Sequence, residues 1–155
     1  MKSNDQSTYT ASHDGTFFAI GLNYKKADAE IRGHFSISEA AQKSILIAAQ
    51  AMGISSLTLI STCNRTELYG FANQAKDLIK LLCEHTQGTI SQFEKVAYVH
   101  QDQQAVSHLF KVGTGLDSQI LGDFEIISQL RNSLRRSKKM GMLNVYMERL
   151  GNAVI

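Results

Sequence analysis

The sequence predicts an α+β fold, a ferredoxin-like split β-α-β antiparallel sheet with additional C-terminal helices. Three observations predict it. Short apolar runs with strand character alternate with helix-like segments in the order β-α-β-β-α-β. Only a few residues separate the second and third strand-like runs, a length suited to a hairpin. Helix-prone segments then continue toward the end of the chain.

The first strand and the first helix are predicted from an apolar run and from capping residues. Residues 17–23, FFAIGLN, are typical of a buried strand. Residues 24–35 have mixed polarity, so we expect a loop or an irregular connection there. Ser36 and Glu39 have the spacing of a capping box, so a helix is expected to begin at this point. Gly53 is suited to the position just after the end of that helix.

Two further strands are expected at 56–61 and 66–72, joined by a short turn at 62–65. Asn64 can adopt the left-handed conformation that such turns often need. Cys63 is therefore predicted to lie at the end of a strand and not within a packed element.

The second half of the chain predicts four more elements. Residues 74–87 form an amphipathic pattern typical of a helix, and 94–100 have strand character. Asp102 is expected to cap a helix over 103–112. A last strongly amphipathic helix is expected from Asp123 to about Lys139.

The composition is that of one ordinary soluble domain. The chain has 155 residues, is 43 % hydrophobic and has a formal net charge of +2. It contains no apolar run of about 18 residues, so no membrane span is expected. The polar N-terminus has no apolar signal segment, and the two cysteines make no disulfide framework, so a reducing, cytoplasmic location is expected. No CxxC or HExxH motif is present, and no metal is expected.

Cys63 is the first candidate for chemistry because it stands in the polar stretch S-T-C-N-R-T-E. A thiolate is a strong nucleophile, and a nearby cation such as Arg65 lowers the pKa of a thiol. Thr62 and Asn64 add groups that could orient a carbonyl or its developing oxyanion. The alternative is that Cys63 is a small buried hydrophobe at a strand end. The residue pattern leaves these two interpretations evenly balanced.

The other candidates are weaker when judged from the residues alone. His100 and His108 could serve as the acid or base of a cysteine nucleophile. Spacing alone favours an ordinary core or surface histidine at position 108. Cys83 lies between leucines of a predicted helix, and we expect it only to pack there.

Two further patterns have open interpretations. The glycines at 113, 115 and 122 follow a predicted helix and do not form a G-x-G-x-x-G fingerprint, so no nicotinamide site is expected. They either allow a ligand to approach the backbone or interrupt helices. The basic run RRSKK at 135–139 is either a solvated face that complements the helix dipole or a patch that contacts phosphates.

The segments STCNRTELY (61–69), AVSHLFKVGTGLDSQILGD (105–123) and IGLNYKKA (20–27) together resemble the N-terminal catalytic domain of glutamyl-tRNA reductases. The polar composition of residues 1–15 predicts a disordered tail, and the resemblance implies the catalytic domain over 16–142 and the start of a linker (spinal) helix over 143–155. It also implies that the NADPH-binding Rossmann domain and the dimerisation domain of the family are absent from this chain.

The resemblance implies roles for particular residues. Cys63 matches the nucleophile that attacks the ester of glutamyl-tRNA to form a thioester. His108 matches the active-site histidine, which handles a proton or orients the substrate. Arg65 matches the residue that holds the glutamate carboxylate, a task suited to a bidentate guanidinium. Thr62, Asn64 and Ser118 match residues that line the same pocket.

The resemblance also implies cofactors and partners. NADPH, bound by a domain outside this chain, would reduce the thioester to glutamate-1-semialdehyde, the first committed intermediate of tetrapyrrole (porphyrin and haem) synthesis by this route. The implied partners are glutamyl-tRNA, the aminomutase that acts on glutamate-1-semialdehyde, and a second subunit in a homodimer. The alternative function is a non-catalytic module that binds tRNA or a regulator and in which Cys63 is structural. A third and weaker hypothesis is feedback by haem bound through a cysteine or histidine.

The chain departs from the family pattern at four positions. Tyr24 and Asp28 stand where the family usually has histidine and proline. Asp123 and Phe124 stand where it usually has glutamate and proline. We expect these changes to affect a loop conformation and the beginning of the last long helix more than the chemistry.

Overall fold

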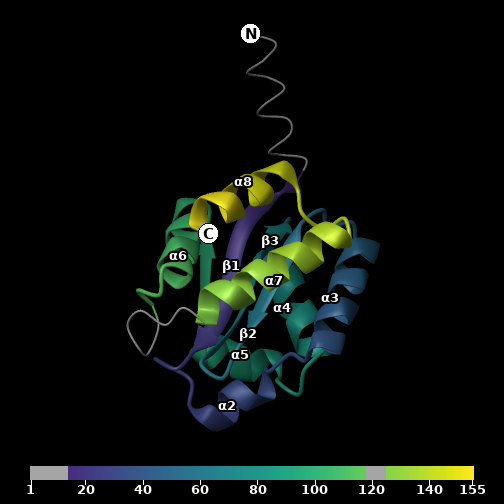
Figure 1. Ribbon diagram of the computed structural model, residues 1–155. Helices are drawn as coiled ribbons and strands as arrows, with labels where there is room; N and C mark the ends of the chain where they lie inside the picture. The colour runs from purple at the N-terminus through teal and green to yellow at the C-terminus, as the bar shows by residue number, and fades with distance from the viewer. Residues whose placement is uncertain (1–13, 118–124) are drawn as a thin grey trace.

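The computed structural model describes residues 14–117 and 125–155, and its centre is a four-stranded sheet. The strand order is β2-β3-β1-β4, and every neighbouring pair is antiparallel (Figure 1). This is the order of a ferredoxin-like split β-α-β sheet, so the predicted fold class is confirmed. The strands are β1 Thr16–Asn23, β2 Leu57–Ser61, β3 Arg65–Ala72 and β4 Tyr98–Gln101.

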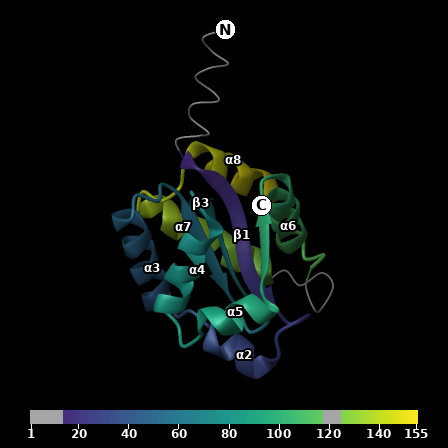
Figure 2. The same ribbon diagram turned by 180° about the vertical axis from the view of Figure 1, so that it is seen from behind.

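Helices cover both faces of the sheet. Helices α3, α4 and α5 lie on one face, and α6, α7 and α8 lie on the other (Figures 1 and 2). None of the described helices is both long and apolar enough to cross a membrane. The helices are α2 Ala29–His34, α3 Glu39–Ala51, α4 Ala75–Glu84, α5 Ile90–Val96, α6 Gln103–Gly113, α7 Glu125–Lys139 and α8 Val145–Val154.

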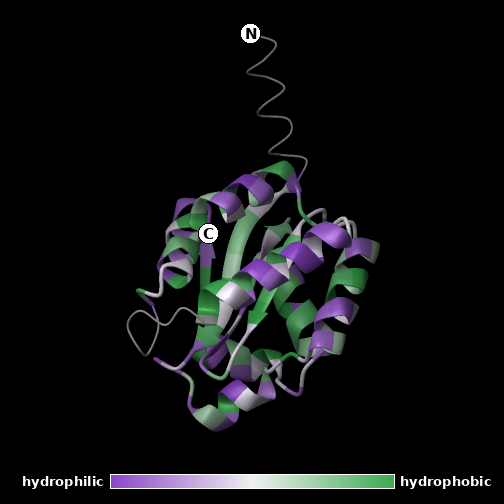
Figure 3. Cartoon of the chain, in the orientation of Figure 1, coloured by the Kyte–Doolittle hydropathy of each residue, from purple (hydrophilic) through white to green (hydrophobic). Residues whose placement is uncertain are grey.

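The alternation of side chains along β1 produces two separate apolar cores. Phe18, Ile20 and Leu22 point to the face covered by α3 and α4. Phe17 and Ala19 point to the face covered by α6, α7 and α8. Because both faces of this central strand are buried, its sequence is an almost continuous apolar run (green in Figure 3).

The expected loop over 24–35 contains a helix, so this prediction is wrong. The carboxylate of Asp28 accepts a hydrogen bond from the backbone N–H of Ile31 at 2.9 Å and caps α2. The next helix, α3, is capped by Ser38, whose hydroxyl accepts from Ala41 N, and not by Ser36. Its predicted end is confirmed, because Gly53 follows with φ of +87°.

The strand predicted over 94–100 is also partly wrong. Residues 90–96 form helix α5, which begins with a capping box between Thr89 and Gln92, and only Tyr98–Gln101 form a strand. Asp102 does precede α6, but its side chain makes no capping hydrogen bond. Asp102 is the only described residue other than glycine with positive φ, so Asn64 is not left-handed as expected.

The C-terminal helices agree with the sequence within the described residues. Helix α7 is present to Lys139, whereas Asp123 and Phe124 lie outside the described residues, as do residues 1–13 of the expected tail. Asn144 caps α8, and Met147 of that helix is fully buried on the sheet. That residues 143–155 begin a longer linker helix stays a prediction.

Gly21 is the point at which β1 lets polar side chains from both neighbouring strands meet. It lies opposite Glu67 of β3 and opposite Tyr98 of β4. A Cβ atom at this position would lie 2.3 Å from the carbonyl oxygen of Thr66 and 2.9 Å from Cγ of Glu67. The absence of a side chain therefore lets the Glu67 and Tyr98 side chains approach each other across the middle strand.

We expect Gly21→Ala to destabilise the domain by about 1–3 kcal/mol, because the methyl group overpacks the sheet. The measurement is the free energy of unfolding in urea. The matched control is Gly33→Ala in α2, where a Cβ would have no atom within 4 Å. This control should be neutral or slightly stabilising. Equal effects of the two substitutions would contradict the packing argument.

Candidate functional site

The buried carboxylate of Glu67 is the centre of a polar cluster on the face covered by α6. Glu67 lies on β3 and is fully buried. Its Oε1 accepts a hydrogen bond from the hydroxyl of Tyr69. Its Oε2 contacts the hydroxyl of Tyr98 on β4 and Nε2 of His108 on α6. Three elements of the fold therefore converge on one carboxylate.

Arg65 extends this cluster toward the end of α6. Its guanidinium is almost completely buried, with Nη1 3.4 Å from Glu67 Oε2 and 3.0 Å from Asp117 Oδ2. Nη2 also donates to the backbone carbonyl of Asp117. Asp117 in turn pairs with Lys25 at 2.7 Å. The guanidinium thus lies between two carboxylates and faces a backbone carbonyl.

The electrostatics favour a charged Glu67. Burial alone would raise the pKa of this carboxyl group, but the hydrogen bond and charge of His108, followed by the charge of Arg65, outweigh it. The pKa of Glu67 therefore lies below its ordinary value. For Asp117, burial again acts to raise the pKa, and the hydrogen bonds from Lys25 and Arg65 lower it overall.

Aromatic rings enclose the cluster at the edge strand. The Tyr98 ring stacks on His100 with centroids 5.3 Å apart, and the His100 and His108 centroids are 4.8 Å apart. Burial, followed by the charge of Glu67, raises the pKa of Tyr98, so this phenol stays a hydrogen-bond donor. Burial, and then the charge of His108, lowers the pKa of His100.

His108 is held in an orientation suited to proton transfer. When the ring is neutral and Nε2 donates to the Glu67 carboxylate, Nδ1 is the nitrogen that can accept a proton from elsewhere. His108 also borders a cavity of about 440 Å³. The cavity is lined by His100, Gln103, Gln104, Ser107, His108, Lys111 and Asp117.

The turn that carries Cys63 is tied down by its neighbours. The hydroxyl of Thr62 accepts hydrogen bonds from the backbone N–H groups of Asn64 and Arg65, at 3.1 and 3.2 Å. Arg32 of α2 donates from Nε to the carbonyl oxygen of Cys63 at 3.0 Å. The Cys63 side chain itself is exposed. A reactive thiol here would be accessible on a fixed backbone.

Some of the predicted site residues are connected by contacts in the structure, and others are not. Arg65 and His108 meet through Glu67, whereas no hydrogen bond or ion pair among the described residues joins Arg65 to Cys63. Thr62 directs its hydroxyl to the turn backbone. Ser118 lies outside the described residues.

Cys83 behaves as the sequence predicted. It is half-buried against the core formed with α3 and α4. Burial, followed by the charge of Glu84, raises the pKa of its thiol. Among the described residues, no group of three or more His, Cys, Asp or Glu side chains is placed to hold a metal ion.

Sequence reasoning missed Glu67, Asp117 and Tyr98. A signal for Glu67 exists in the chain, because it is the one carboxylate within the strand-like run TELYGFA. A charge inside a buried strand indicates a partner elsewhere. No such signal exists for Asp117, whose partner Arg65 is 52 positions away.

Similarity to known proteins identifies the family to which the chain belongs. The family model described as "Glutamyl-tRNAGlu reductase, N-terminal domain" matches residues 20–155. The chain belongs to this family. The resemblance seen in STCNRTELY and the segment 105–123 is therefore confirmed.

Two curated glutamyl-tRNA reductases are close relatives of this glutamyl-tRNA reductase N-terminal domain. The protein from Christiangramia forsetii is 61 % identical over 147 residues, which cover 95 % of this chain and 35 % of the relative. That from Flavobacterium psychrophilum is 60 % identical and is covered over 35 % of its length. The chain thus spans about a third of the length of these two relatives, both of which are named as reductases.

A solved structure supports the fold independently. The glutamyl-tRNA reductase from Methanopyrus kandleri matches 89 % of this chain and 32 % of its own chain, with a TM-score of 0.72. At 23 % sequence identity, this similarity concerns the architecture alone.

We expect Glu67→Gln to destabilise the domain by about 3 kcal/mol near neutral pH, because it removes one charge from a buried ion-pair cluster. Since the folded pKa of Glu67 is lowered, its contribution is present above its unfolded pKa of about 4.3 and is lost as pH falls below that value. The variant should therefore lose less stability on acidification than the parent chain. Urea unfolding at several pH values measures both effects.

Glu148→Gln is the matched control, because Glu148 forms an exposed pair with Lys138. This substitution should change stability by less than about 1 kcal/mol. An unchanged acid dependence in Glu67→Gln would contradict the assignment of the buried charge.

Proposed function

We propose that this chain is the acyl-accepting domain of a glutamyl-tRNA reductase and that Cys63 is its nucleophile. The observation that carries the proposal is the exposed Cys63 side chain on a turn fixed by Thr62 and Arg32, in a chain of this family. A nucleophile needs access to the substrate and a defined position, and this turn supplies both.

The proposed step is acyl transfer from the ester of glutamyl-tRNA. The sulfur of Cys63 attacks the ester carbonyl carbon, so that a C–S bond forms and the C–O bond to the terminal ribose breaks. His108 takes the thiol proton on Nδ1 and returns it to the departing ribose oxygen. Glu67 stabilises the imidazolium that exists between these transfers, as a carboxylate does in other histidine pairs.

Arg65 is proposed to hold the side-chain carboxylate of the glutamyl group. Its guanidinium already binds the Asp117 carboxylate at 3.0 Å, so the site is suited to this chemistry. We infer that the substrate carboxylate replaces that of Asp117, which keeps its ion pair with Lys25. Asn64 and Ser118 are proposed to line the same pocket, while Thr62 stiffens the turn.

Reduction of the thioester is assigned to the part of the relatives that this chain does not cover. NADPH would supply a hydride that yields glutamate-1-semialdehyde, the precursor of tetrapyrroles. Gly113 is the last residue of α6 and Gly115 comes after that helix, so neither follows a strand and they do not fit a dinucleotide site. No step of the reduction is therefore assigned to residues of this chain.

The proposal for the whole enzyme includes its organisation and partners. Residues 16–142 would be the catalytic domain and 143–155 the beginning of the linker helix. The full-length protein would be a homodimer that passes its product to the glutamate-1-semialdehyde aminomutase. The alternative, a binding module with a structural Cys63, requires that residue to be packed, and its exposure favours the enzyme instead.

We expect the chain to form a covalent glutamyl adduct at Cys63 when it is mixed with glutamyl-tRNA. Mass spectrometry of the intact protein and of its peptides measures the adduct. Cys63→Ser should lose the thioester, whereas Cys83→Ser, at the half-buried second cysteine, should keep it. The same adduct on Cys63→Ser would show that the nucleophile is another residue.

We expect His108→Asn to slow adduct formation by about 10²–10⁴-fold, the usual contribution of a positioned acid–base group. The measurement is the single-turnover rate of adduct formation as a function of pH. The control is His85→Asn, at the end of α4 on the other face of the sheet, which should leave the rate and its pH profile unchanged. An unaltered pH profile in His108→Asn would overturn the proton-transfer role.

A further inference from the structure

Helix α7 concentrates positive charge on its outward side. It carries five of the sixteen Lys and Arg residues of the chain within 15 residues. Four of these cations are exposed, and we call them the basic ridge: Arg131, Arg135, Lys138 and Lys139. Among residues 126–139 of this helix, the other exposed residues are Ser128 and Asn132, so this side of α7 is hydrophilic (Figure 3).

Most of this charge has no role within the described structure. Lys138 pairs with Glu148 of α8 at 2.9 Å, and Arg136 contacts Gln42 and Glu39 of α3. The remaining cations of the ridge form no ion pair with a described residue. Compensation of the helix dipole concerns only the last turn, so it does not explain Arg131 and Arg135.

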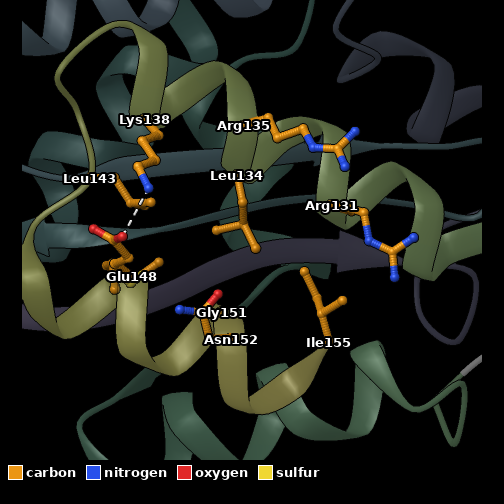
Figure 4. Close-up of a pocket in the computed structure, with 10 residues that line it drawn as sticks. Arg131, Leu134, Arg135, Lys138, Leu143, Glu148, Gly151, Asn152 and Ile155 are labelled. Atoms are coloured by element: carbon orange, nitrogen blue, oxygen red, sulfur yellow. Dashed lines mark hydrogen bonds and ion pairs between the residues drawn. The ribbon is translucent and has the colours of Figure 1, made fainter.

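The basic ridge has a groove on one side and a pocket on the other. A groove of about 350 Å³ separates it from α8, and Arg131, Arg135 and Lys138 line its α7 side. Figure 4 shows that the guanidinium groups of Arg131 and Arg135 extend to the same side of α7 and have no bonded partner among the residues drawn. Along the helix these two residues are about 6 Å apart.

The pocket on the other side of the ridge is polar and leads toward the turn with Cys63. It has a volume of about 200 Å³ and lies between α7 and α3. Gln129 lines it, and its Oε1 is buried without a hydrogen bond from any described group. Ser61, at the end of β2, also lines it and stands two positions before Cys63. The remaining lining residues are Ile37, Glu39, Gln42, Asn132, Ser133 and Arg136.

We propose that the basic ridge binds the backbone phosphates of the tRNA near its aminoacylated end. The inference rests on the proposed function and names the surface that holds the RNA part of the substrate. A row of unpaired cations recognises phosphates without regard to base sequence. The carboxamides and hydroxyls of the adjoining pocket can form hydrogen bonds with ribose or base groups. A helix that lies on a membrane would expose apolar side chains beside its cations, and no residue described as exposed on α7 is apolar.

The test compares RNA binding by two variants with the same change in net charge. The ridge variant is Arg131→Gln, Arg135→Gln and Lys139→Gln together, which leaves the paired Lys138 and Arg136 in place. The control variant is Lys43→Gln, Lys76→Gln and Lys80→Gln, which removes three exposed cations from α3 and α4 on the other face. Fluorescence anisotropy with labelled tRNA specific for glutamate, between about 50 and 200 mM salt, gives the affinity and its salt dependence.

The ridge variant should bind at least about tenfold more weakly, and the slope of log K against log salt should become less steep by about two to three. The control variant should remain within about twofold of the parent chain. Circular dichroism should show equal melting temperatures for all three proteins. Equal binding by the two variants would overturn the proposal. Ridge-dependent binding to phosphatidylserine vesicles without ridge-dependent tRNA binding would also overturn it, in favour of a lipid surface.

A small ester substrate distinguishes failure of this inference from failure of the proposed function. The ridge variant should form the Cys63 adduct more slowly from glutamyl-tRNA but at the parent rate from glutamyl-adenosine, which has no phosphate chain. An equal loss of rate with both esters would contradict a role limited to the RNA. If the parent chain reacts with neither ester, the proposed function fails, whereas ridge-dependent tRNA binding would still support the inference.

Discussion

The burial of the Glu67 carboxylate is the constraint on which the rest of the site depends. A carboxylate removed from water is strongly unfavourable unless donors and positive charges surround it. Here those partners come from β3, β4 and α6, as Arg65, Tyr98 and His108. The strand pairing and the packing of α6 must therefore be in place together before the charge is satisfied. This requirement makes the sheet and the polar cluster one cooperative unit.

The two faces of the sheet differ in the kinds of side chains that they bury. The face under α3 and α4 is an apolar core. The face under α6, α7 and α8 combines an apolar part around Phe17 and Phe71 with a polar part around Glu67. Cys63 lies at the rim on a turn held by Arg32 of α2. Under the proposed function, this turn would give the Cys63 nucleophile the defined position that catalysis needs.

The charges of the chain are divided between this interior and one outer surface. Inside, Arg65 and Lys25 are balanced by Glu67 and Asp117, and under the proposed function this cluster of fixed polar groups would act on the small acyl group. Outside, the basic ridge of α7 is largely unbalanced within the described residues. The proposed substrate, which joins one amino acid to a long polyanion, would need both kinds of surface, since the acyl group and the phosphates are recognised by different physical interactions.

The sequence by itself determined the fold class, the strand β1, the hairpin between β2 and β3, and the place of Cys63 at a strand end. These features depend on apolar periodicity and turn length within a few residues of each other. The family resemblance added the expected roles of His108 and Arg65, which the residues alone had offered only as candidates. Only the tertiary structure decided that Glu67 unites them, because its contacts with Tyr98 and His108 span 31 and 41 positions. Strand order and helix packing create such pairs, and no local pattern along the chain specifies them.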